Sequence, residues 1–460
     1  MAIPKQVQQI LDDEQIRYRV ADVSDSLERP PKSATAVSVV LEDDKGQLQI
    51  ICPRDHMIDL EKMNEKLGRK LMAISYRSLQ KLYSNHGLEV LPAIPQLTGL
   101  PALVENSLLR NEFIYIDSGT QHQYIKVKDD EFKRITGNAT FMDITTPVRE
   151  IHQRFPQVED DIQDITNAVE NFTSLRIKQR LEQTIEIPPL PETAQKIIQL
   201  RVDPNADIHH LIEVVEKDPS LAAQVVSWAA SPYYAAPGKI RSIEDAVIRV
   251  LGFDLVINLA IGLSLGKTLN PPKNEPEGFT PYWKQAAYCS LAVEGMVRKI
   301  PPKQRPELGL AYLGGLLHNF GYLVLAFVFP PHLELINRYR EANPHINYVD
   351  IERHVLGVSR DQIGGWLMQI WDMPDEVAKA IRYQNDIEYV STHAEYAYLL
   401  YIASQMLCKH GIGDGLDEPI PEHMFNTLSL TPGEAEEAIT NLIEKSEAVE
   451  NLYMTFNSVA

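Results

Sequence analysis

Hydrophobic and polar positions in the first 148 residues follow two different periods. In Lys5–Ile16, the residues Val7, Ile10 and Leu11 share one face, which predicts an amphipathic helix. Asp59 and Gly68 mark the start and the end of a second predicted helix. Runs rich in β-branched and aromatic residues predict strands at Ala36–Leu41, Leu48–Cys52, Ala102–Val104, Phe113–Asp117 and Tyr124–Val127. The pattern indicates an α+β region with antiparallel strands.

From Ile187 onward the hydrophobic spacing is that of helices. Apolar residues three or four positions apart predict successive helices at Glu192–Leu200, Ala206–Lys217, Ser220–Ala230, Ser242–Val250 and Asp254–Lys267. Connections of this length, rich in Pro and Gly, are typical of a compact all-α domain. The loop Asn270–Thr280 divides this domain into two helical halves. Residues Pro421–Ala460 predict one helix, capped at Thr431, and a frayed tail.

The segment between these regions has a helical stripe of its own. Apolar residues recur at alternating spacings of four and three, with charged residues between them, at Val158, Ile162, Ile165, Val169 and Phe172. The stripe covers only about two heptads, which is too short to identify a coiled coil. Two interpretations stay open: a connector helix packed on its own chain, and a helix that forms a homodimer.

These changes of pattern predict a multidomain protein. We expect an α+β domain over residues 1–148, a helical linker over 149–186, an all-α domain over 187–411 and a C-terminal helical extension over 412–460. A chain of 460 residues is long enough for two or three domains with separate hydrophobic cores.

Charge and cysteine content narrow the functional class. Residues 1–148 carry 18 Lys/Arg and 21 Asp/Glu, whereas the remainder carries 26 and 42, within a total net charge of −19. The acidic second part disfavours binding to nucleic-acid phosphates there. Three scattered cysteines fit neither a disulfide framework nor a CxxC metal site. With no secretory signal visible, and with apolar stretches at Leu255–Leu265 and Tyr322–Phe329 that are too short to span a bilayer, we expect a cytoplasmic protein without membrane association.

The run Gly314-Gly315-Leu316-Leu317-His318-Asn319-Phe320-Gly321 resembles a metal-binding motif with one ligand replaced. A His-Asp pair here would place an imidazole and a carboxylate next to each other for a divalent cation. Asn319 supplies only a neutral amide oxygen. We expect His318 to be a hydrogen-bonded interior residue, with metal ligation and contact with a ligand or partner as the alternatives.

The segment from about Ile187 to Gly411 resembles the HDOD family, an all-helical relative of the HD phosphohydrolases. The resemblance rests on motifs that include Pro188-Pro189-Leu190-Pro191, Asp218-Pro219-Ser220-Leu221, Ser231-Pro232-Tyr233-Tyr234, Ser242-Ile243-Glu244-Asp245-Ala246, Leu251-Gly252, Leu316-Leu317-His318, Gly364, Trp371 and Pro374. The parent enzymes bind one or two metals through spaced His and Asp residues.

The resemblance implies that this chain has lost those ligands. At the degenerate positions stand Gln285, His318, Asn319, Arg360, Gln384 and Asn385. Arg360 would repel a cation. Asp361, Asp386 and Glu388 lack the paired spacing of replacement ligands. We therefore expect no metal, no cofactor and no phosphohydrolase catalysis, as the family itself implies.

Residues 1–148 resemble the YbaK/prolyl-tRNA-synthetase-associated editing domain, which hydrolyses misacylated tRNA and whose fold is a mixed sheet with helices. The resemblance rests on the strand Ala36–Leu41, Arg54-Asp55-His56-Met57-Ile58-Asp59, Leu67-Gly68-Arg69-Lys70, Gly87-Leu88-Glu89-Val90-Leu91-Pro92, Ile114–Asp117 and Gly119. In active members, a Lys at the start of the central strand is important for deacylation. Here that strand reads Ala36-Val37-Ser38-Val39-Val40, and the nearest lysines are Lys32 and Lys45.

Three further groups of residues have a functional and a structural interpretation. The basic set Lys62, Lys66, Arg69 and Lys70 either contacts tRNA phosphates or forms an ion-paired face with Glu61 and Glu65; we favour the second. His56, between Asp55 and Asp59, is either an acid/base group or part of a surface turn; we favour the turn, because no nucleophile is evident. Tyr233 and Tyr234 are core residues or a loop that contacts a partner.

The sequence therefore favours a non-catalytic bacterial regulatory protein. We expect an HDOD domain that binds a protein partner or senses a ligand, coupled to a deacylase-like domain that binds tRNA or a small ligand. An aminoacyl-tRNA deacylase with an accessory HDOD domain is one alternative, and a metal-dependent HD-type phosphodiesterase is another. A homodimer also stays open.

Overall fold

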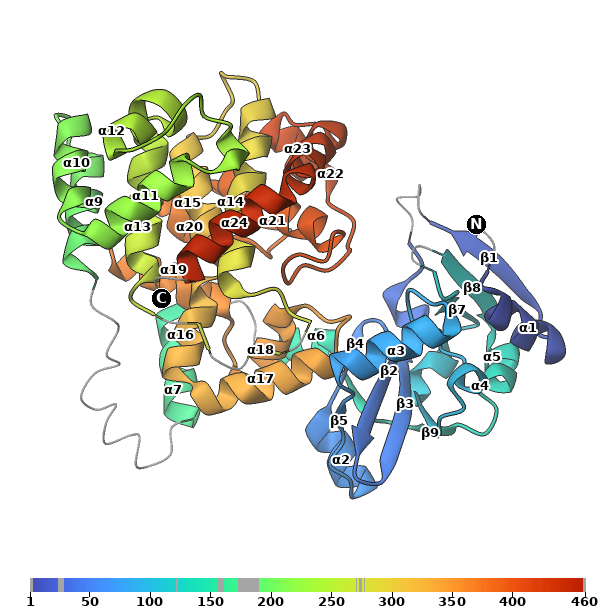
Figure 1. The fold of residues 1–460 in the computed structure, drawn as a ribbon. Coiled ribbons are helices and arrows are strands. Elements are labelled where there is room, and N and C mark those ends of the chain that lie inside the picture. The colour runs from blue at the N-terminus through green and yellow to red at the C-terminus, as the bar shows by residue number, and fades with distance from the viewer. Residues whose placement is uncertain are drawn as a thin grey trace. The chain divides into compact units, whose positions relative to one another are not determined.

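In the computed structural model, the chain folds into two compact units (Figure 1). The structure describes residues 3–23, 29–120, 123–154, 161–172, 190–269, 271–272, 275–276 and 278–457. The sheet unit comprises Met1–Gln157, Pro276–Gly278 and Glu334–Val355, and the helical unit comprises Val158–Glu275, Phe279–Leu333 and Leu356–Ala460. The α+β and all-α classes are confirmed.

The sheet unit contains a mixed sheet in the strand order β1-β8-β7-β2-β3-β6-β9, with β5 paired to β2. The expected antiparallel strands are present in the pairs β1–β8, β7–β8, β2–β3 and β2–β5. The pairs β2–β7, β3–β6 and β6–β9 are parallel, so the sheet is mixed. Helices lie between these strands in the chain and return it in the same direction. The strands are β1 (Tyr18–Asp22), β2 (Thr35–Asp43), β3 (Gly46–Pro53), β5 (Met72–Ala73), β6 (Ala102–Glu105), β7 (Phe113–Asp117), β8 (Gln123–Lys128) and β9 (Thr140–Met142), and a separate antiparallel pair joins β4 (His56–Ile58) to β10 (Thr145–Pro147).

Helices cover the sheet and close its core. Asp59 caps α2 by accepting from the Lys62 amide, and Gly68 ends the helix at a φ of 59°, as predicted. Val7 and Leu11 of the first helix are fully buried against the sheet. The helices of this unit are α1 (Lys5–Asp13), α2 (Leu60–Leu67), α3 (Tyr76–His86), α4 (Pro95–Thr98), α5 (Asp129–Thr136) and α6 (Val148–Arg154), with 3-10 turns at Lys32–Ala34 and Asn106–Arg110.

One segment of the sheet unit is distant from the rest in sequence. Residues Glu334–Val355 carry most of α17 (Pro330–Ala342) and α18 (Tyr348–Leu356), and we call this segment the inserted hairpin. It falls inside the predicted all-α domain of residues 187–411, yet its contacts are with residues 1–157. The predicted domain boundaries stay a prediction. However, the sheet unit is not one contiguous stretch of sequence, because it includes this segment from within residues 187–411.

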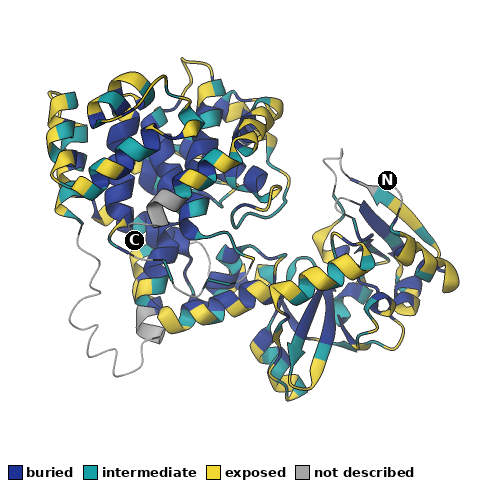
Figure 2. Ribbon diagram, viewed as in Figure 1, coloured by how far each residue is buried: buried dark blue, intermediate teal, exposed yellow. Residues whose placement is uncertain are grey.

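The helical unit is built around buried apolar helices (Figure 2). Every residue of α15 from Gly309 to Leu317 is buried, because the helix is packed on several sides. The helices are α7 (Asp161–Phe172), α9 (Glu192–Val202), α10 (Ile208–Glu216), α11 (Pro219–Ala229), α12 (Ile243–Ala246), α13 (Phe253–Gly266), α14 (Tyr282–Lys299), α15 (Leu308–Leu317), α16 (Phe320–Val328), α19 (Arg360–Ile370), α20 (Asp375–Tyr383), α21 (Ala394–Cys408), α22 (Glu422–Leu428), α23 (Pro432–Glu444) and α24 (Ser446–Asn457), with a 3-10 turn at Pro232–Tyr234 and a π-helical turn at Val247–Leu251.

Three expectations for this unit need revision. The tail is not frayed as far as it is described, because α24 buries Val449 and Leu452. The apolar run Leu308–Val328 is longer than the apolar stretches identified in the sequence. Among the described residues, it is the candidate membrane span by length and composition. However, 78% of its most apolar window is buried inside the fold, as in the core helix of a globular domain. In the linker, Ile165 is buried but Ile162 is 61% exposed, so the apolar stripe does not pack as one face. Val158, residues 173–186 and the side chains of Val169 and Phe172 lie outside the described residues.

Glycines set the closest helix contacts of this unit. A Cβ atom on Gly321 would lie 1.9 Å from the carbonyl oxygen of Arg360, and one on Gly315 would lie 2.7 Å from the Cα of Ser290. Backbone therefore meets backbone where α16 crosses the start of α19 and where α15 crosses α14. The glycines of the motif around His318 are packing residues, and they bring the candidate site together.

Candidate functional site

The helical unit assembles its candidate site from four separate elements. Gln285 lies on α14, Asn319 lies in the two-residue break between α15 and α16, and Arg360 is the first residue of α19. Asp414, in the loop after α21, completes the group. All four side chains are buried, and that of Arg360 is only 1% exposed.

Hydrogen bonds join these four side chains into a closed ring. Arg360 Nη1 donates to Asn319 Oδ1 and to Asp414 Oδ2, each at 2.9 Å. Asn319 Nδ2 donates to Gln285 Oε1 at 3.1 Å, and Gln285 Nε2 donates to Asp414 Oδ1 at 3.3 Å. We call these residues the polar ring. Asn319 fixes the orientation of both neighbours, because its oxygen faces the guanidinium and its nitrogen faces the Gln285 oxygen.

The remaining predicted positions form a second group beside the ring. Gln384 Nε2 donates to Asp361 Oδ1 at 3.1 Å and to the His318 carbonyl oxygen at 2.7 Å. Asn385 Nδ2 donates to Asp361 Oδ2 at 2.8 Å. The structure therefore places Asp361 as the acceptor for two carboxamides. Asp386 and Glu388 form a local turn, in which the Glu388 amide donates to the Asp386 carboxylate.

His318 is partly buried and hydrogen-bonded to its own helix. Its Nδ1 lies 2.8 Å from the Gly315 carbonyl oxygen, which can only accept, so this nitrogen carries the proton. Burial lowers the pKa of His318 from its usual 6.5 to about 4, although the bond to Gly315 acts in the opposite direction. The imidazole is therefore neutral at physiological pH and takes no part in the ring.

The chemistry of the polar ring suits an anion better than a cation. The two groups that contact the Asp414 carboxylate are the Arg360 guanidinium and the Gln285 carboxamide nitrogen, both of which donate. Among the described residues there is no group of three or more His, Cys, Asp or Glu side chains that could hold a metal ion. Asp414 is absent from the predicted site residues. The only signal for it in the sequence is its place in the glycine-rich run Gly411–Gly415.

The linker helix is attached to the helices that carry this site. Asp161 of α7 forms an ion pair with Arg382 of α20 and accepts from Gln362 of α19 at 3.1 Å. Gln362 also caps α19, where its side chain accepts from the amide of Ser359, the residue before Arg360. The described part of the linker therefore contacts Gln362, which lies two residues after Arg360 of the polar ring.

In the sheet unit, a buried glutamine network lies at the central strand. Gln49 of β3 is fully buried, and its Nε2 donates to Ser38 Oγ at 2.7 Å and to the Pro92 carbonyl oxygen at 3.3 Å. Thr98 Oγ1 donates to Gln49 Oε1 at 2.7 Å. Ser38 lies on β2, the strand at whose start the resemblance places the lysine of active editing domains. Uncharged groups therefore fill the hydrogen-bonding positions of one another around Gln49 and Ser38.

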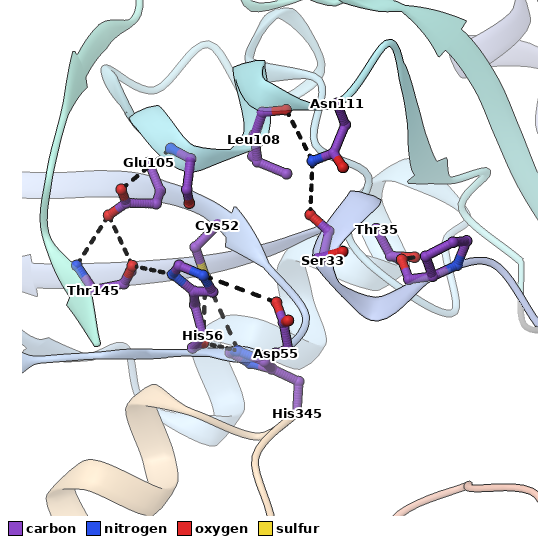
Figure 3. Close-up of polar contacts among 12 residues, drawn as sticks. Ser33, Thr35, Cys52, Asp55, His56, Glu105, Leu108, Asn111, Thr145 and His345 are labelled. Carbon is purple, nitrogen blue, oxygen red and sulfur yellow. Dashed lines mark hydrogen bonds and ion pairs between the residues drawn. The ribbon is translucent and has the colours of Figure 1, made fainter. Parts of the chain in front are cut away.

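A second group of polar side chains surrounds His56 (Figure 3). Thr145 Oγ1 donates to Glu105 Oε2 at 2.7 Å, and His56 Nδ1 lies 2.8 Å from the same hydroxyl. Since the hydroxyl proton is used on Glu105, Nδ1 of His56 carries a proton and Nε2 is the free base. Nε2 lies 4.0 Å from Asp55 Oδ1. His56 starts β4 and its side chain is only 13% exposed, so the expectation of a surface turn is wrong.

The inserted hairpin covers the free edge of β4. Asn343 Oδ1 accepts from the Ile58 amide at 2.6 Å, and Asn343 Nδ2 donates to the Ile58 carbonyl oxygen at 3.1 Å. His345 Nε2 lies 2.9 Å from the His56 carbonyl oxygen (Figure 3). Since β10 occupies the other edge, these two side chains take the place of a neighbouring strand. Burial lowers the pKa of His345 to about 4.

The basic set on α2 has partners within its own unit. Lys62 donates to the Thr145 carbonyl oxygen at 3.0 Å, and Lys66 donates to that of Asp143 at 2.7 Å. Arg69 forms an ion pair with Asp43. These acceptors are carbonyl groups and Asp43, so the favoured ion pairs with Glu61 and Glu65 stay a prediction. Contact with tRNA stays a prediction.

Tyr233 and Tyr234 differ in their surroundings. Tyr234 Oη donates to Glu294 Oε2 at 3.0 Å, and Glu294 is only 2% exposed. Tyr233 packs against Tyr234 and lies under the ammonium group of Lys445, 5.0 Å from the ring centre. Tyr234 is thus engaged in the core, and a partner contact stays a prediction that fits Tyr233 better.

Comparison with known proteins gives two family matches and one relative of full length. The HDOD domain model matches residues 187–387, and the aminoacyl-tRNA editing domain model matches residues 17–135. A protein from Marinobacter aquaeolei VT8, whose crystal structure is provisionally named as that of a signal transduction protein, is 42% identical. That similarity covers 99% of this chain and 100% of the other, with a TM-score of 0.87. Both resemblances predicted from the motifs are confirmed.

More distant relatives match one part of the chain. An HDOD domain protein of unknown function from Geobacter sulfurreducens is 22% identical and covers 60% of this chain and 95% of its own, with a TM-score of 0.48. An uncharacterized protein from Treponema pallidum (strain Nichols) is 23% identical over 244 residues, which are 52% of this chain. The match covers 46% of that curated relative, so the chain spans about half of its length.

Proposed function

Because this chain belongs to the proteins that join an aminoacyl-tRNA editing domain to an HDOD domain, we propose that it is a non-catalytic regulatory protein. In this proposal the HDOD domain binds a protein partner or a small ligand, and the editing-like domain takes part in the response. Each domain retains the shape of an enzyme but has neutral or donating groups at the positions where the enzymes have ligands and lysine. A regulatory role agrees with the provisional name of the full-length relative.

The polar ring is the observation on which the proposal rests. A guanidinium paired with a carboxylate, 1% and 7% exposed, fills the centre of the HDOD site. Breaking such a buried pair is strongly unfavourable, so the ring opposes metal entry through both charge and packing. Ring opening and closing is a two-state change of the kind that a ligand can shift.

Two bonded segments, one within each unit, support a proposal of coupling between the domains. The inserted hairpin belongs to the HDOD sequence but is bonded to β4 through Asn343 and His345. The linker helix α7 is bonded through Asp161 to α19 and α20. Both connections begin at helices that carry or adjoin site residues. We propose that they convey the ligand state, as coupled binding requires.

The test compares partner binding with catalysis on the full chain. Capture from the native cell should recover a specific protein or ligand, and its addition should change hydrogen exchange in α7 and in residues 334–355. Metal content should be well below one Mn, Fe or Mg per chain, with no phosphodiester turnover. Stoichiometric metal with turnover would establish the phosphodiesterase alternative instead. Failure to bind any component of the extract would contradict the regulatory proposal.

The oriented imidazole of His56 favours one second candidate, an aminoacyl-tRNA deacylase. Thr145 and Glu105 hold the ring with Nε2 as the free base, which is the arrangement of a general base. Burial lowers the pKa of His56, so Nε2 is unprotonated near neutral pH. Hydrolysis of misacylated tRNA that is lost in His56→Ala or Lys32→Ala would support this candidate. Absence of hydrolysis by the wild-type protein would reject it.

A further inference from the structure

We propose that Arg360 and Gln285 form a binding site for a small oxyanion, a carboxylate or a phosphate group, and that Asp414 occupies this site as an internal ligand. The proposal deepens the function proposed above, on which it rests, by naming the chemical class of the ligand. A cellular ligand would bind by displacing the Asp414 side chain.

The donor geometry supports this assignment. The two carboxylate oxygens of Asp414 are bound separately, Oδ2 by the guanidinium at 2.9 Å and Oδ1 by the Gln285 carboxamide at 3.3 Å. A pair of donors aimed at two oxygens of one group is the usual way in which proteins recognise carboxylates and phosphates. Asn319 contacts both donors: its Oδ1 accepts from the same Arg360 Nη1 that donates to Asp414, and its Nδ2 donates to Gln285 Oε1.

Donors and occupant are anchored to different degrees. Gln285 lies within α14 and Arg360 starts α19, and the contact of Gly321 with the Arg360 carbonyl oxygen fixes that end of the helix. Asp414 instead lies in a loop in which Gly411 and Gly413 have φ values of 69° and 90°. Thr280 holds this loop, with its hydroxyl accepting from the Gly413 amide at 3.0 Å and donating to the Gly411 carbonyl oxygen at 3.4 Å. The donors therefore lie on helices, whereas the anion lies in a loop whose backbone depends on glycines at positive φ.

Electrostatics explains why a ligand must carry negative charge. Arg360 is buried and remains protonated, so removal of Asp414 leaves a cation that water reaches poorly. An anion restores the negative charge that Asp414 supplied, and the two donors favour one with two terminal oxygens. Carboxylates and phosphates share this chemistry, and the experiment separates them.

The test is rescue of full-length Asp414→Ala by added anions. The variant should unfold at a lower temperature than the wild type, and millimolar sodium phosphate or sodium acetate should raise its midpoint relative to sodium chloride at equal ionic strength. Whichever anion acts at lower concentration identifies the preferred class. We expect at least a tenfold tighter apparent Kd for that anion in Asp414→Ala than in the wild type, where Asp414 competes.

Controls keep the proposal falsifiable. Rescue should disappear in the double variant Asp414→Ala/Arg360→Gln, which lacks the guanidinium. If Asp414→Ala does not fold, Asp414→Asn keeps the side-chain volume, and the same anions should stabilise it. The proposal is overturned if a folded Asp414 variant gains no more stability from phosphate or acetate than from chloride, or if the double variant is rescued equally. Either result would leave the regulatory function intact, because that is tested by partner capture.

Discussion

Gly321 is the residue whose replacement should disturb the candidate site most directly. A methyl group there would meet the Arg360 carbonyl oxygen at 1.9 Å, and backbone cannot move aside as a flexible side chain can. We expect Gly321→Ala to lower the free energy of unfolding by about 2–3 kcal/mol, measured by chemical denaturation. Gly433→Ala is the matched control, because nothing lies within 4 Å of its added methyl group. Equal stability of the two variants would contradict this packing.

His345 should make the sheet unit sensitive to acid. Burial lowers its pKa from 6.5 to about 4, so its contribution to stability is fully present above pH 6.5 and is lost as the pH falls through 4. We expect a loss of about 2–3 kcal/mol over this range. His345→Gln keeps a donor to the His56 carbonyl oxygen but takes up no proton, so its stability should fall less steeply. Burial raises the pKa of Asp117 to about 6, but this group titrates in both proteins and cancels in the difference. Parallel curves for the two proteins would contradict the expectation.

At the scale of single residues, the sequence predicted chemical type better than partner. The motifs predicted that Gln285, Asn319 and Arg360 place amide and guanidinium groups where metal ligands would stand. The structure joins these three residues in one ring. Asp414 was not predictable, because the loop that carries it is 54 residues from Arg360 and follows no helical period. The surroundings of His56 were not predictable either, because its partners Glu105 and Thr145 are distant in the chain.

Among the elements, the linker helix should depend on one carboxylate. Asp161 contacts both Arg382 and Gln362, so Asp161→Asn removes an ion pair that is 10% and 21% exposed at its two side chains. We expect faster hydrogen exchange throughout α7, by about tenfold, corresponding to about 1.4 kcal/mol. Glu150→Gln breaks an exposed pair at 3.9 Å with Arg154 and serves as the control, with little expected change. Unchanged exchange in α7 would mean that other contacts hold it.

Elements with a strong local signal were predictable, and those that depend on distant partners were not. The caps Asp59 and Gly68 fixed α2, and β7 begins and ends where its apolar run does. Strands β4 and β10 have three residues each and no period to detect. Strand direction also escaped the pattern, because alternation of hydrophobic residues is the same in parallel and antiparallel strands. The final helix was missed because its burial depends on α14, with Lys284 paired to Glu450.

Considered as a whole, the molecule should not separate at its apparent domain boundary. A fragment of residues 1–157 lacks Asn343 and His345 and exposes the edge of β4. We expect it to unfold at a lower temperature than the sheet unit does in the full chain, with loss of amide protection at Ile58. Asn343→Ala in the full chain should reproduce the loss at Ile58 alone. A fragment as stable as the sheet unit in the full chain would show that the inserted hairpin is dispensable.

The inserted hairpin also has a consequence for inheritance. A recombination event that exchanged everything after residue 187 would also replace the inserted hairpin, which binds β4 of the first domain. The new segment need not carry an amide side chain at position 343 or an imidazole at position 345. Chimeras made by swapping HDOD modules between relatives should therefore succeed only when those 22 residues, Glu334–Val355, travel with the editing domain rather than with the module that encloses them.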